Sequence, residues 1–529
     1  MPRVAATGPA REAAAVSTPH FQVTFGADGA VTAWTLKYRG AKPLAVGAPL
    51  APLAVAVTRT GRAPEVVALA PEAPRLEIAP GQPPASLRFA GVTGDGVRIY
   101  KILEFHADRY VVGVRLGAEG LGTAEDVALA LYWTGPVAEP WGPPGSAPLV
   151  TIGAGPEGQQ LLGRILLARA PGVRPEVFEA PAPAIRDRKE TPAGPELKDP
   201  QPVETMVVPV ERGWVGLEND YVIAALIADR GGRLLRGRDR DLAQAALVFP
   251  AVQWQPGRPW EGRGEIYVGP KEWEQLKAVG VGLEQAQARN YGCFPLPCDY
   301  GGPMPMEWVT VPLLWLLNFF ARALPGQNYG IAIILLTLLV KVVFYPLSHK
   351  SMTSMKQMQA LQPQLNALRN KYRSDPQRFQ REQMDLYRKH RVNPMGGCLP
   401  MIVQIPIFYA LYLTLQYSVE LQGAPFVGWI TDLSKKDPYY VLPILMGASM
   451  LVQQKMTPTV GDPRQAKIML FMPVIFTFMF LEFPTGLVLY WLVNNVLQIA
   501  QQMVIDRTAG ARVKTAVIEG KPDKEPRKA

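Results

Sequence analysis

The stretch that most constrains this chain is Tyr329–Leu347, a mostly apolar run that carries one charge, Lys341. Its 19 residues would form about 28 Å of helix at ~1.5 Å per residue, close to the ~30 Å thickness of a hydrocarbon core. Inside lipid, a single segment satisfies all its backbone polar groups only as a helix. The sequence therefore predicts a membrane-spanning helix here.

Lys341 shares one face of this helix with Thr337, Tyr345 and Ser348, because the four residues are spaced three or four positions apart. A charge inside a membrane costs roughly 2.5 to 3.5 kcal/mol and by default marks a functional site. The side chain could instead extend toward the membrane surface near Ser348. The aligned Thr and Tyr favour an inward-facing, hydrated groove.

Apolar residues are unevenly spread over the 529 positions. Residues 1 to about 290 are rich in Pro and Gly with short strand-like runs, whereas 307–505 contains nearly all the long apolar segments. The formal charge of +10 is dispersed, which suits a membrane protein with basic cytoplasmic loops and does not indicate a specific nucleic-acid partner.

No catalytic or metal-binding motif stands out in this composition. Three Cys exclude a disulfide-rich scaffold, and the four His are scattered without metal-ligand spacing. A Gly-rich phosphate loop and a GxSxG motif are also missing from the sequence. We expect no cofactor, no metal and no enzymatic activity.

Residues 21–290 show a β pattern, with short runs of β-branched and aromatic residues punctuated by Gly and Pro. Phe21, Val23 and Phe25 alternate as in a half-exposed antiparallel sheet. We predict a β-sandwich domain with a docking or spacer role, a Pro-rich surface loop at 175–202 and a helix at 271–289. Residues 1–20 contain no apolar run and are expected to be a disordered N-terminal segment.

A linker, 291–306, carries Cys293 and Cys298, which are either a small-loop disulfide or two free thiols. The apolar segment 307–324 contains Trp308 and Trp315 and ends near Arg322. These features predict an interfacial helix that lies in the headgroup plane.

Residues 351–391 are polar and helical in pattern, with a turn and helix start at Asp375-Pro376. They predict a helical hairpin, which its excess of Lys and Arg places in the cytoplasm. Its stripe of Met residues is either an adaptable surface for apolar client segments or a plain hairpin seam.

Four further spans are predicted at 398–421, 441–456, 468–481 and 483–505, followed by a basic cytoplasmic tail, 508–529. With 329–347 they make five transmembrane helices, which place the β-domain outside and the tail inside. The 468–481 span would cover only about 21 Å at ~1.5 Å per residue, so it predicts either packing without tilt or a locally thinned bilayer.

Polar side chains recur on several of these spans: Thr337, Lys341, Gln404, Asn494, Asn495 and Gln498. Each on its own could join two helices by a hydrogen bond. Together they could line a water-holding cavity open toward the cytoplasmic half, where Lys341 would meet an acidic group of a client.

Several motifs in order resemble the bacterial YidC membrane-protein insertase family, which is related to the mitochondrial Oxa and chloroplast Albino insertases. They are VKVVFYPLSHKSMTSMKQMQALQP, VNPMGGCLPMIVQIPIFYALY, DPYYVLPILMGASM, KIMLFMPVIFTFMF and FPTGLVLYWLVNN. The match is dense over about 307–507. The preceding β-domain resembles the large periplasmic domain of the Gram-negative members.

This resemblance implies a hydrated groove, closed to the outside, with a cation in its first core helix. By position Lys341, Thr337, Gln404 and Trp491 would line the groove, and we add Asn494 and Asn495 from the polar pattern. Ile405, Pro406 and Met479 would form an apolar slide along which a client leaves for lipid.

Three departures from the family pattern qualify this assignment. Lys341 stands where most members carry Arg, and Glu482 stands where an aromatic residue is usual. The family's first membrane helix finds no counterpart in residues 1–20.

The resemblance implies a membrane insertase and chaperone of the cell inner membrane. Its partners would be nascent membrane-protein clients, the lipid bilayer, the Sec translocon, and ribosomes or targeting factors that meet the hairpin and tail. The alternative from the residues alone is a polytopic transporter that uses Lys341 as an ion or substrate site. Against it stand the lack of inverted repeats and of an acid partner for Lys341 within the spans.

Overall fold

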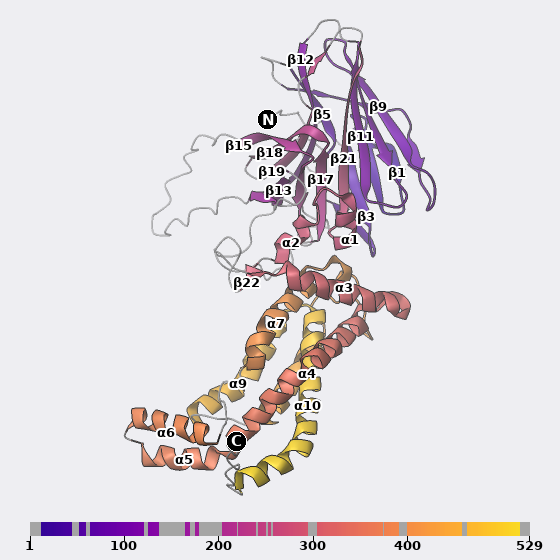
Figure 1. The fold of residues 1–529 in the computed structure, drawn as a ribbon. Coiled ribbons are helices and arrows are strands. Elements are labelled where there is room, and N and C mark those ends of the chain that lie inside the picture. The colour runs from indigo at the N-terminus through magenta and orange to yellow at the C-terminus, as the bar shows by residue number, and fades with distance from the viewer. Residues whose placement is uncertain are drawn as a thin grey trace, which may run out of the picture. The chain divides into compact units, whose positions relative to one another are not determined.

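We analysed a computed structural model of the chain. The structure describes residues 12–44, 52–59, 64–120, 125–136, 164–169, 175–178, 204–219, 221–239, 242–249, 252–254, 258–291, 293–294, 304–373, 375–390, 399–456 and 463–518. The chain divides into two compact units, Met1–Asn290 and Tyr291–Ala529. The first consists mainly of strands and the second of helices (Figure 1), which confirms the predicted division into a β-rich region and a helical region.

The first unit contains a five-stranded sheet in the order β4-β3-β2-β1-β8. Its strands are antiparallel except for the parallel pair β1 and β8. Their bounds are β1 (Glu12–Ser17), β2 (Phe21–Gly26), β3 (Val31–Lys37), β4 (Ala41–Leu44) and β8 (Arg75–Glu77).

A nine-stranded antiparallel sheet follows the order β14-β13-β16-β17-β21-β11-β10-β9-β7. Every residue of β16 and β17 is buried, as expected for strands covered on both faces. The bounds are β7 (Ala70–Pro71), β9 (Ala85–Val92), β10 (Arg98–Phe105), β11 (Val111–Glu119), β13 (Arg164–Ala168), β14 (Glu176–Phe178), β16 (Trp214–Glu218), β17 (Val222–Ala228) and β21 (Trp260–Pro270).

A seven-stranded antiparallel sheet has the order β15-β18-β19-β12-β5-β6, with β20 paired to β12. The bounds are β5 (Ala54–Arg59), β6 (Glu65–Val67), β12 (Glu125–Pro136), β15 (Glu204–Glu211), β18 (Arg230–Asp239), β19 (Leu242–Val248) and β20 (Val252–Trp254).

Aromatic side chains join the three sheets into one core. Phe25 of β2 lies 5.0 Å from Phe89 of β9, measured between ring centroids. Trp34 of β3 lies 5.7 Å from Trp133 of β12. Large buried rings bring the most apolar area out of water per residue, so they contribute much of the stabilisation of this unit.

Three predictions for this unit need correction. Residues 12–17 form β1 and are not part of a disordered segment, because β1 pairs with β2 and β8. The predicted loop 175–202 begins with β14, and residues 179–203 lie outside the described residues, as does Cys298. The single helix at 271–289 is two helices, α1 (Trp273–Val279) and α2 (Gln285–Tyr291), because Gly280 ends α1 with a φ of 76°.

The second unit consists of a two-stranded sheet, β22 (Cys293–Phe294) with β23 (Met304–Pro305), and a set of helices. Two single 3-10 turns, η2 (Pro325–Gln327) and η4 (Val419–Leu421), follow α3 and α7. The helices are α3 (Glu307–Ala323), α4 (Tyr329–Ala360), α5 (Gln362–Lys371), α6 (Pro376–Lys389), α7 (Leu399–Tyr417), α8 (Val441–Met456), α9 (Pro463–Phe480) and α10 (Thr485–Ile518).

Three helices of this unit are longer than predicted. The helix α4 continues past Ser348 to Ala360, and α10 continues to Ile518. The predicted ends lie where the apolar run stops, but many of the residues that follow, among them Ala, Met, Lys, Gln and Arg, are good helix formers. The helix α9 starts at Pro463 and has 18 residues, about 27 Å at ~1.5 Å per residue. The helix around the predicted 468–481 span is therefore longer than that span.

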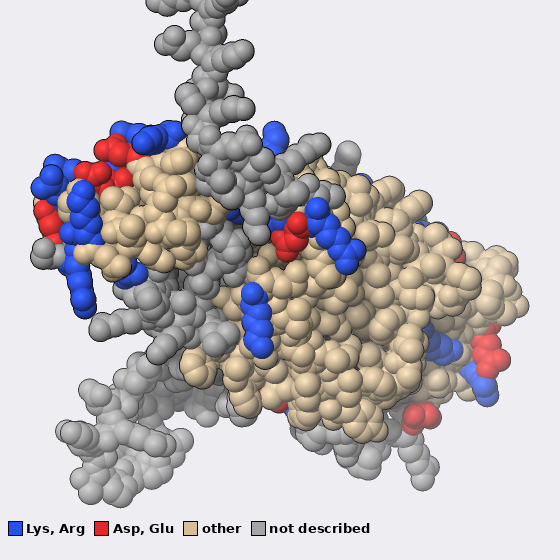
Figure 2. All heavy atoms as spheres, turned by 90° about the horizontal axis from the view of Figure 1, so that it is seen from below, with Lys and Arg blue, Asp and Glu red and all other residues tan. Residues whose placement is uncertain are grey.

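By length and composition, one helix among the described residues is long and apolar enough to cross a membrane, Tyr329–Met358. A shorter apolar stretch, Phe471–Phe480, lies in α9. By contrast, α5 and α6 are rich in charge, and Figure 2 shows side chains of both signs gathered where this pair of helices lies. The pair is held by a small cluster of Leu361, Leu365 and Tyr387.

Short polar contacts fix the helices at the end of the bundle where α4 and α10 begin. Tyr329 donates its hydroxyl to Asn318 Oδ1 at 3.0 Å, and Asn318 donates to Glu420 Oε1 at 3.3 Å. Thr485, the first residue of α10, donates its hydroxyl and its N–H to the carbonyl oxygen of Lys435. These contacts set the positions from which α4 and α10 run side by side.

Candidate functional site

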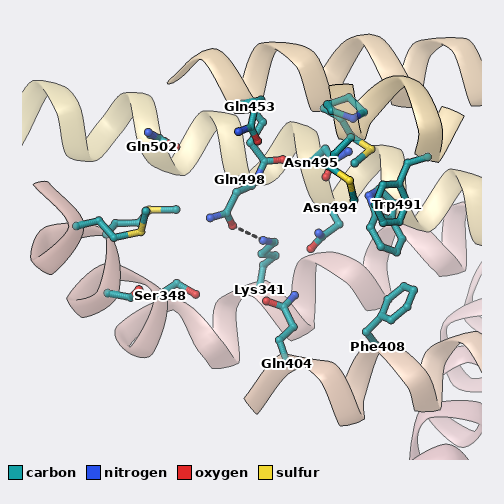
Figure 3. A pocket seen from close by; sticks show the side chains of 18 of the residues that line it. Lys341, Ser348, Gln404, Phe408, Gln453, Trp491, Asn494, Asn495, Gln498 and Gln502 are labelled. Atoms are coloured by element: carbon teal, nitrogen blue, oxygen red, sulfur yellow. Dashed lines mark hydrogen bonds between the residues drawn. The ribbon is translucent and has the colours of Figure 1, made fainter. Parts of the chain in front are cut away.

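A cavity of about 510 Å³ lies between α4, α7, α8, α9 and α10 (Figure 3). Several of the polar residues that the sequence analysis singled out on its apolar helices line this cavity. Its walls have two different chemistries, and each follows from the spacing of residues along the helices that contribute to it.

The α4 wall carries Lys341 and the residues that follow it at helical spacing, Ser348 and Met352. The Lys341 ammonium donates to Gln498 Oε1 of α10 at 2.6 Å. Figure 3 shows this side chain pointing from α4 across the cavity toward α10. A neutral amide oxygen satisfies one donor of the ammonium and leaves its positive charge in place.

The α10 wall is a stripe of polar residues after Trp491, namely Asn494, Asn495, Gln498 and Gln502. They recur every three or four residues, so they share one face of the helix. Asn495 donates to Ser449 Oγ of α8 at 3.2 Å, and Gln502 donates to the carbonyl oxygen of Met456 at 2.7 Å. These bonds hold α10 against α8.

Aromatic and sulfur-containing side chains form the apolar wall. The Phe408 and Trp491 rings pack edge to face with centroids 4.6 Å apart. Phe476 lies 6.2 Å from Trp491, also between centroids. Four methionines complete the wall: Met352, Met355, Met450 and Met472. Because Met is flexible and polarisable, such a wall adapts to apolar groups of different shapes.

The lining of the cavity is positively charged. Lys341 and Lys356 line it, and none of the described residues that line it is Asp or Glu. Across the described residues, no group of three or more His, Cys, Asp or Glu side chains is placed to hold a metal ion. The chemistry available here is therefore that of a cationic, amide-rich cavity with an apolar side.

The structure brings five of the six predicted groove residues together around the cavity: Lys341, Gln404, Trp491, Asn494 and Asn495. Thr337 is different, because only 1% of it is exposed and its hydroxyl donates to the carbonyl oxygen of Ile333 in its own helix at 2.6 Å. It is not among the residues that line the cavity, and its hydroxyl is taken up by that hydrogen bond within α4.

The predicted slide residues lie on the outer surface of the helices. Ile405 is 47% exposed and also lines the cavity, while Met479 is 46% exposed on α9. Pro406 lies inside α7, directly after Ile405, and is half-buried. Their role as a slide stays a prediction.

Sequence reasoning missed several polar lining residues: Lys356, Gln453, Gln454 and Gln502. A signal for Gln502 was present, because it continues the helical spacing of Asn494 and Gln498. Lys356 falls within the predicted hairpin, 351–391, because the predicted end of its helix is too early.

Comparison with known proteins relates most of the chain to one family. Residues 319–512 match the family described as 60Kd inner membrane protein, and residues 198–316 match the YidC periplasmic domain. The membrane protein insertase YidC of Geobacter sulfurreducens is 39% identical over 83% of this chain and 73% of its own length. The chain belongs to the YidC family.

Other YidC relatives align over less of their length. The YidC protein of Syntrophus aciditrophicus is 49% identical over 56% of this chain, and the alignment spans only about half of that relative, 52%. A crystal structure described as an active YidC insertase with its first transmembrane domain resolved covers 92% of this chain at 18% identity, with a TM-score of 0.38.

Proposed function

We propose that this chain is a membrane-protein insertase and chaperone that receives a polar tail and an apolar segment of a client in the cavity and releases the apolar segment into lipid. The observation that carries the proposal is the pairing of two chemistries in one cavity. Lys341 and the amides of α10 line the same cavity as the methionines and the aromatic rings. Membership of the YidC family supports the same function.

Such a cavity would lower the free-energy barrier for moving a polar tail across the membrane. An unsatisfied polar group in hydrocarbon costs several kcal/mol. Amide side chains and water in the cavity replace part of the lost hydration while a tail crosses. Meanwhile the apolar segment contacts the Met wall and then the exposed surface around Ile405 and Met479, so it stays in an apolar environment.

We further propose five transmembrane helices, formed by α4, α7, α8, α9 and the first part of α10, with α3 lying at the interface. The β-rich unit would then be periplasmic, and the α5–α6 hairpin and the C-terminal tail cytoplasmic. The excess of Lys and Arg in the hairpin and tail supports this orientation. In it the hairpin and tail are placed to meet ribosomes or targeting factors, and the outer helix surfaces to meet the Sec translocon.

Reconstitution into liposomes tests the proposal. The purified chain should insert a single-span client that carries a short polar tail, with no added energy source. Tail protection from an external protease measures insertion. A transporter would leave the client outside and move a solute or ion instead, so lack of protection together with a Lys341-dependent ion flux would overturn the proposal.

A further inference from the structure

The second cation of the cavity, Lys356, is bound by a carboxylate that lies outside the cavity lining. Lys356 of α4 forms an ion pair with Asp506 of α10. The Lys356 side chain is 13% exposed and lines the cavity, whereas Asp506 is 46% exposed and does not.

The two lysines lie at different depths along the same helix. Fifteen positions separate Lys341 from Lys356, about 22 Å along α4 at ~1.5 Å per residue. Lys356 is close to the end of α4, so it marks the end of the cavity nearest the α5–α6 hairpin. Asp506 follows Gln502 by one helical turn and continues the polar stripe of α10.

The partners of the two lysines differ in charge. Lys341 binds the neutral amide of Gln498, and Lys356 binds the carboxylate of Asp506. Because Lys356 is poorly hydrated, it needs an acceptor, and a carboxylate is the strongest one available. Because Asp506 is half exposed, its attraction is screened by water and the pair can open readily.

We propose that Lys356 is a second receiving cation, and that Asp506 acts as a tethered substitute for an acidic residue of the client tail. An entering carboxylate displaces Asp506, binds Lys356 and is then placed to move along the cavity toward Lys341. This inference rests on the proposed insertase function and adds an acidic client tail as the ligand of Lys356.

The competing interpretation is a structural clamp, in which the pair only holds α4 against α10. A charge swap separates the two. The double variant Lys356→Asp with Asp506→Lys keeps an ion pair between the helices but places a carboxylate in the cavity. If the pair is a clamp, the double variant should insert clients as fast as the wild type. If Lys356 is a receiving cation, the double variant should lose that function.

The experiment uses the full chain in liposomes and two matched single-span test clients, one with two Asp in its short tail and one with Asn in their place. Lys356→Gln should slow insertion of the Asp client about two- to fivefold, the size expected for loss of a partly exposed charge pair. Asp506→Asn should speed up insertion of the Asp client by a similar factor. Neither variant should change insertion of the Asn client.

The charge-swapped double variant should insert the Asp client at least as slowly as Lys356→Gln does. If it restores the wild-type rate, or if both clients respond equally to every variant, the pair is a clamp and the inference is wrong. Glu482→Gln serves as the control, because it breaks an exposed ion pair with Lys436 outside the cavity. If the wild-type chain inserts neither client, it is the proposed function that fails.

Discussion

The ammonium of Lys341 lies 2.6 Å from Oε1 of Gln498, so the cation of α4 is held toward α10 across the cavity. This contact joins residues 157 positions apart and involves no opposite charge. A hydrogen bond to a neutral amide orients the ammonium without neutralising it, so the charge remains available to an acidic group of a client.

The first prediction follows from that free charge. Lys341→Arg should keep insertion of clients with acidic tails, because charge and reach are retained. Lys341→Ala should reduce it about tenfold or more, since a hydrogen bond to a charged group contributes about 1.5–3 kcal/mol. Lys341→Glu should be worse than Ala. Initial insertion rates in liposomes measure each effect.

Clients with uncharged tails provide the control for this series and should insert at similar rates with all four proteins. If Lys341→Ala matches the wild type on acidic tails, the lysine only extends toward the membrane surface and the electrostatic part of the mechanism is lost.

The second prediction concerns the partner of Lys341. Gln498→Glu places a carboxylate where the amide oxygen now accepts, so it should pair with Lys341 and neutralise it. Insertion of acidic tails should then fall about as far as in Lys341→Ala. Gln498→Met has a similar volume and no charge, and it should have a much smaller effect. Equal rates for the Glu and Met variants would show that the charge state of Lys341 does not matter.

The sequence was sufficient to pick out several of the polar residues that line the cavity. Lys341, Gln404, Asn494 and Asn495 are polar residues in apolar helices, and the helical period puts the last two on the face that continues to Gln498. Periodicity cannot show which helix faces which, so the Lys341–Gln498 contact and the Lys356–Asp506 pair became visible only with tertiary structure.

Helix ends and one strand could not be predicted, for two physical reasons. At Ser348 polarity changes while the helix continues, because polarity reports the environment of a residue and not its backbone conformation. At Glu12–Ser17 the sequence EAAAVS has low strand propensity, but pairing with β2 and β8 makes it a strand. Tertiary context outweighs local preference at such a site.

The third prediction concerns topology. Gln380 is exposed on α6, and the proposed orientation places it in the cytoplasm. In a version without the three native cysteines, Gln380→Cys should react with a membrane-impermeant maleimide only after the cells are permeabilised. A cysteine at exposed Arg98 of β10 should react in intact spheroplasts. Labelling of Gln380→Cys from outside would reverse the proposed orientation.

The fourth prediction is that the α5–α6 hairpin is mobile and still required. Its core is small, with Leu361, Leu365 and Tyr387 as its buried residues, so its amides should exchange with solvent faster than those of α4. Replacing residues 362–389 with a short Gly/Ser linker should abolish insertion while helix content and monodispersity in detergent are retained. Full insertion by this variant would show that the hairpin is dispensable.

The fifth prediction concerns the stability of the β-rich unit, where Lys101 of β10 is buried. Its Nζ donates to the carbonyl oxygen of Gly29 at 2.6 Å and to that of Leu53 at 2.8 Å. Burial lowers the pKa of Lys101 from its ordinary 10.5 to about 7, against a smaller opposing effect of Asp28. A neutral amine has two N–H donors, so these two carbonyl oxygens can accept from both of them.

The pH dependence follows from this lowered pKa. Between about pH 7 and the ordinary lysine pKa, the unfolded chain binds a proton at Lys101 that the folded chain lacks, so the free energy of unfolding should rise with pH. The slope is at most about 1.4 kcal/mol per pH unit. Below pH 7 both states are protonated and this contribution becomes constant, with the cost of burying the charge fully present.

This slope can be measured by unfolding the full chain with urea in detergent at several pH values between 6.5 and 9. Amide exchange of peptides from β9 and β10 reports the unfolding of this unit. Lys101→Met should flatten it and lower stability at pH 9 by about 1–3 kcal/mol, because two buried carbonyl oxygens lose their donor. Lys277→Met, at an exposed position of α1, should leave the slope unchanged. If Lys101→Met keeps the wild-type slope, Lys101 is charged in the folded protein and the pH dependence has another source.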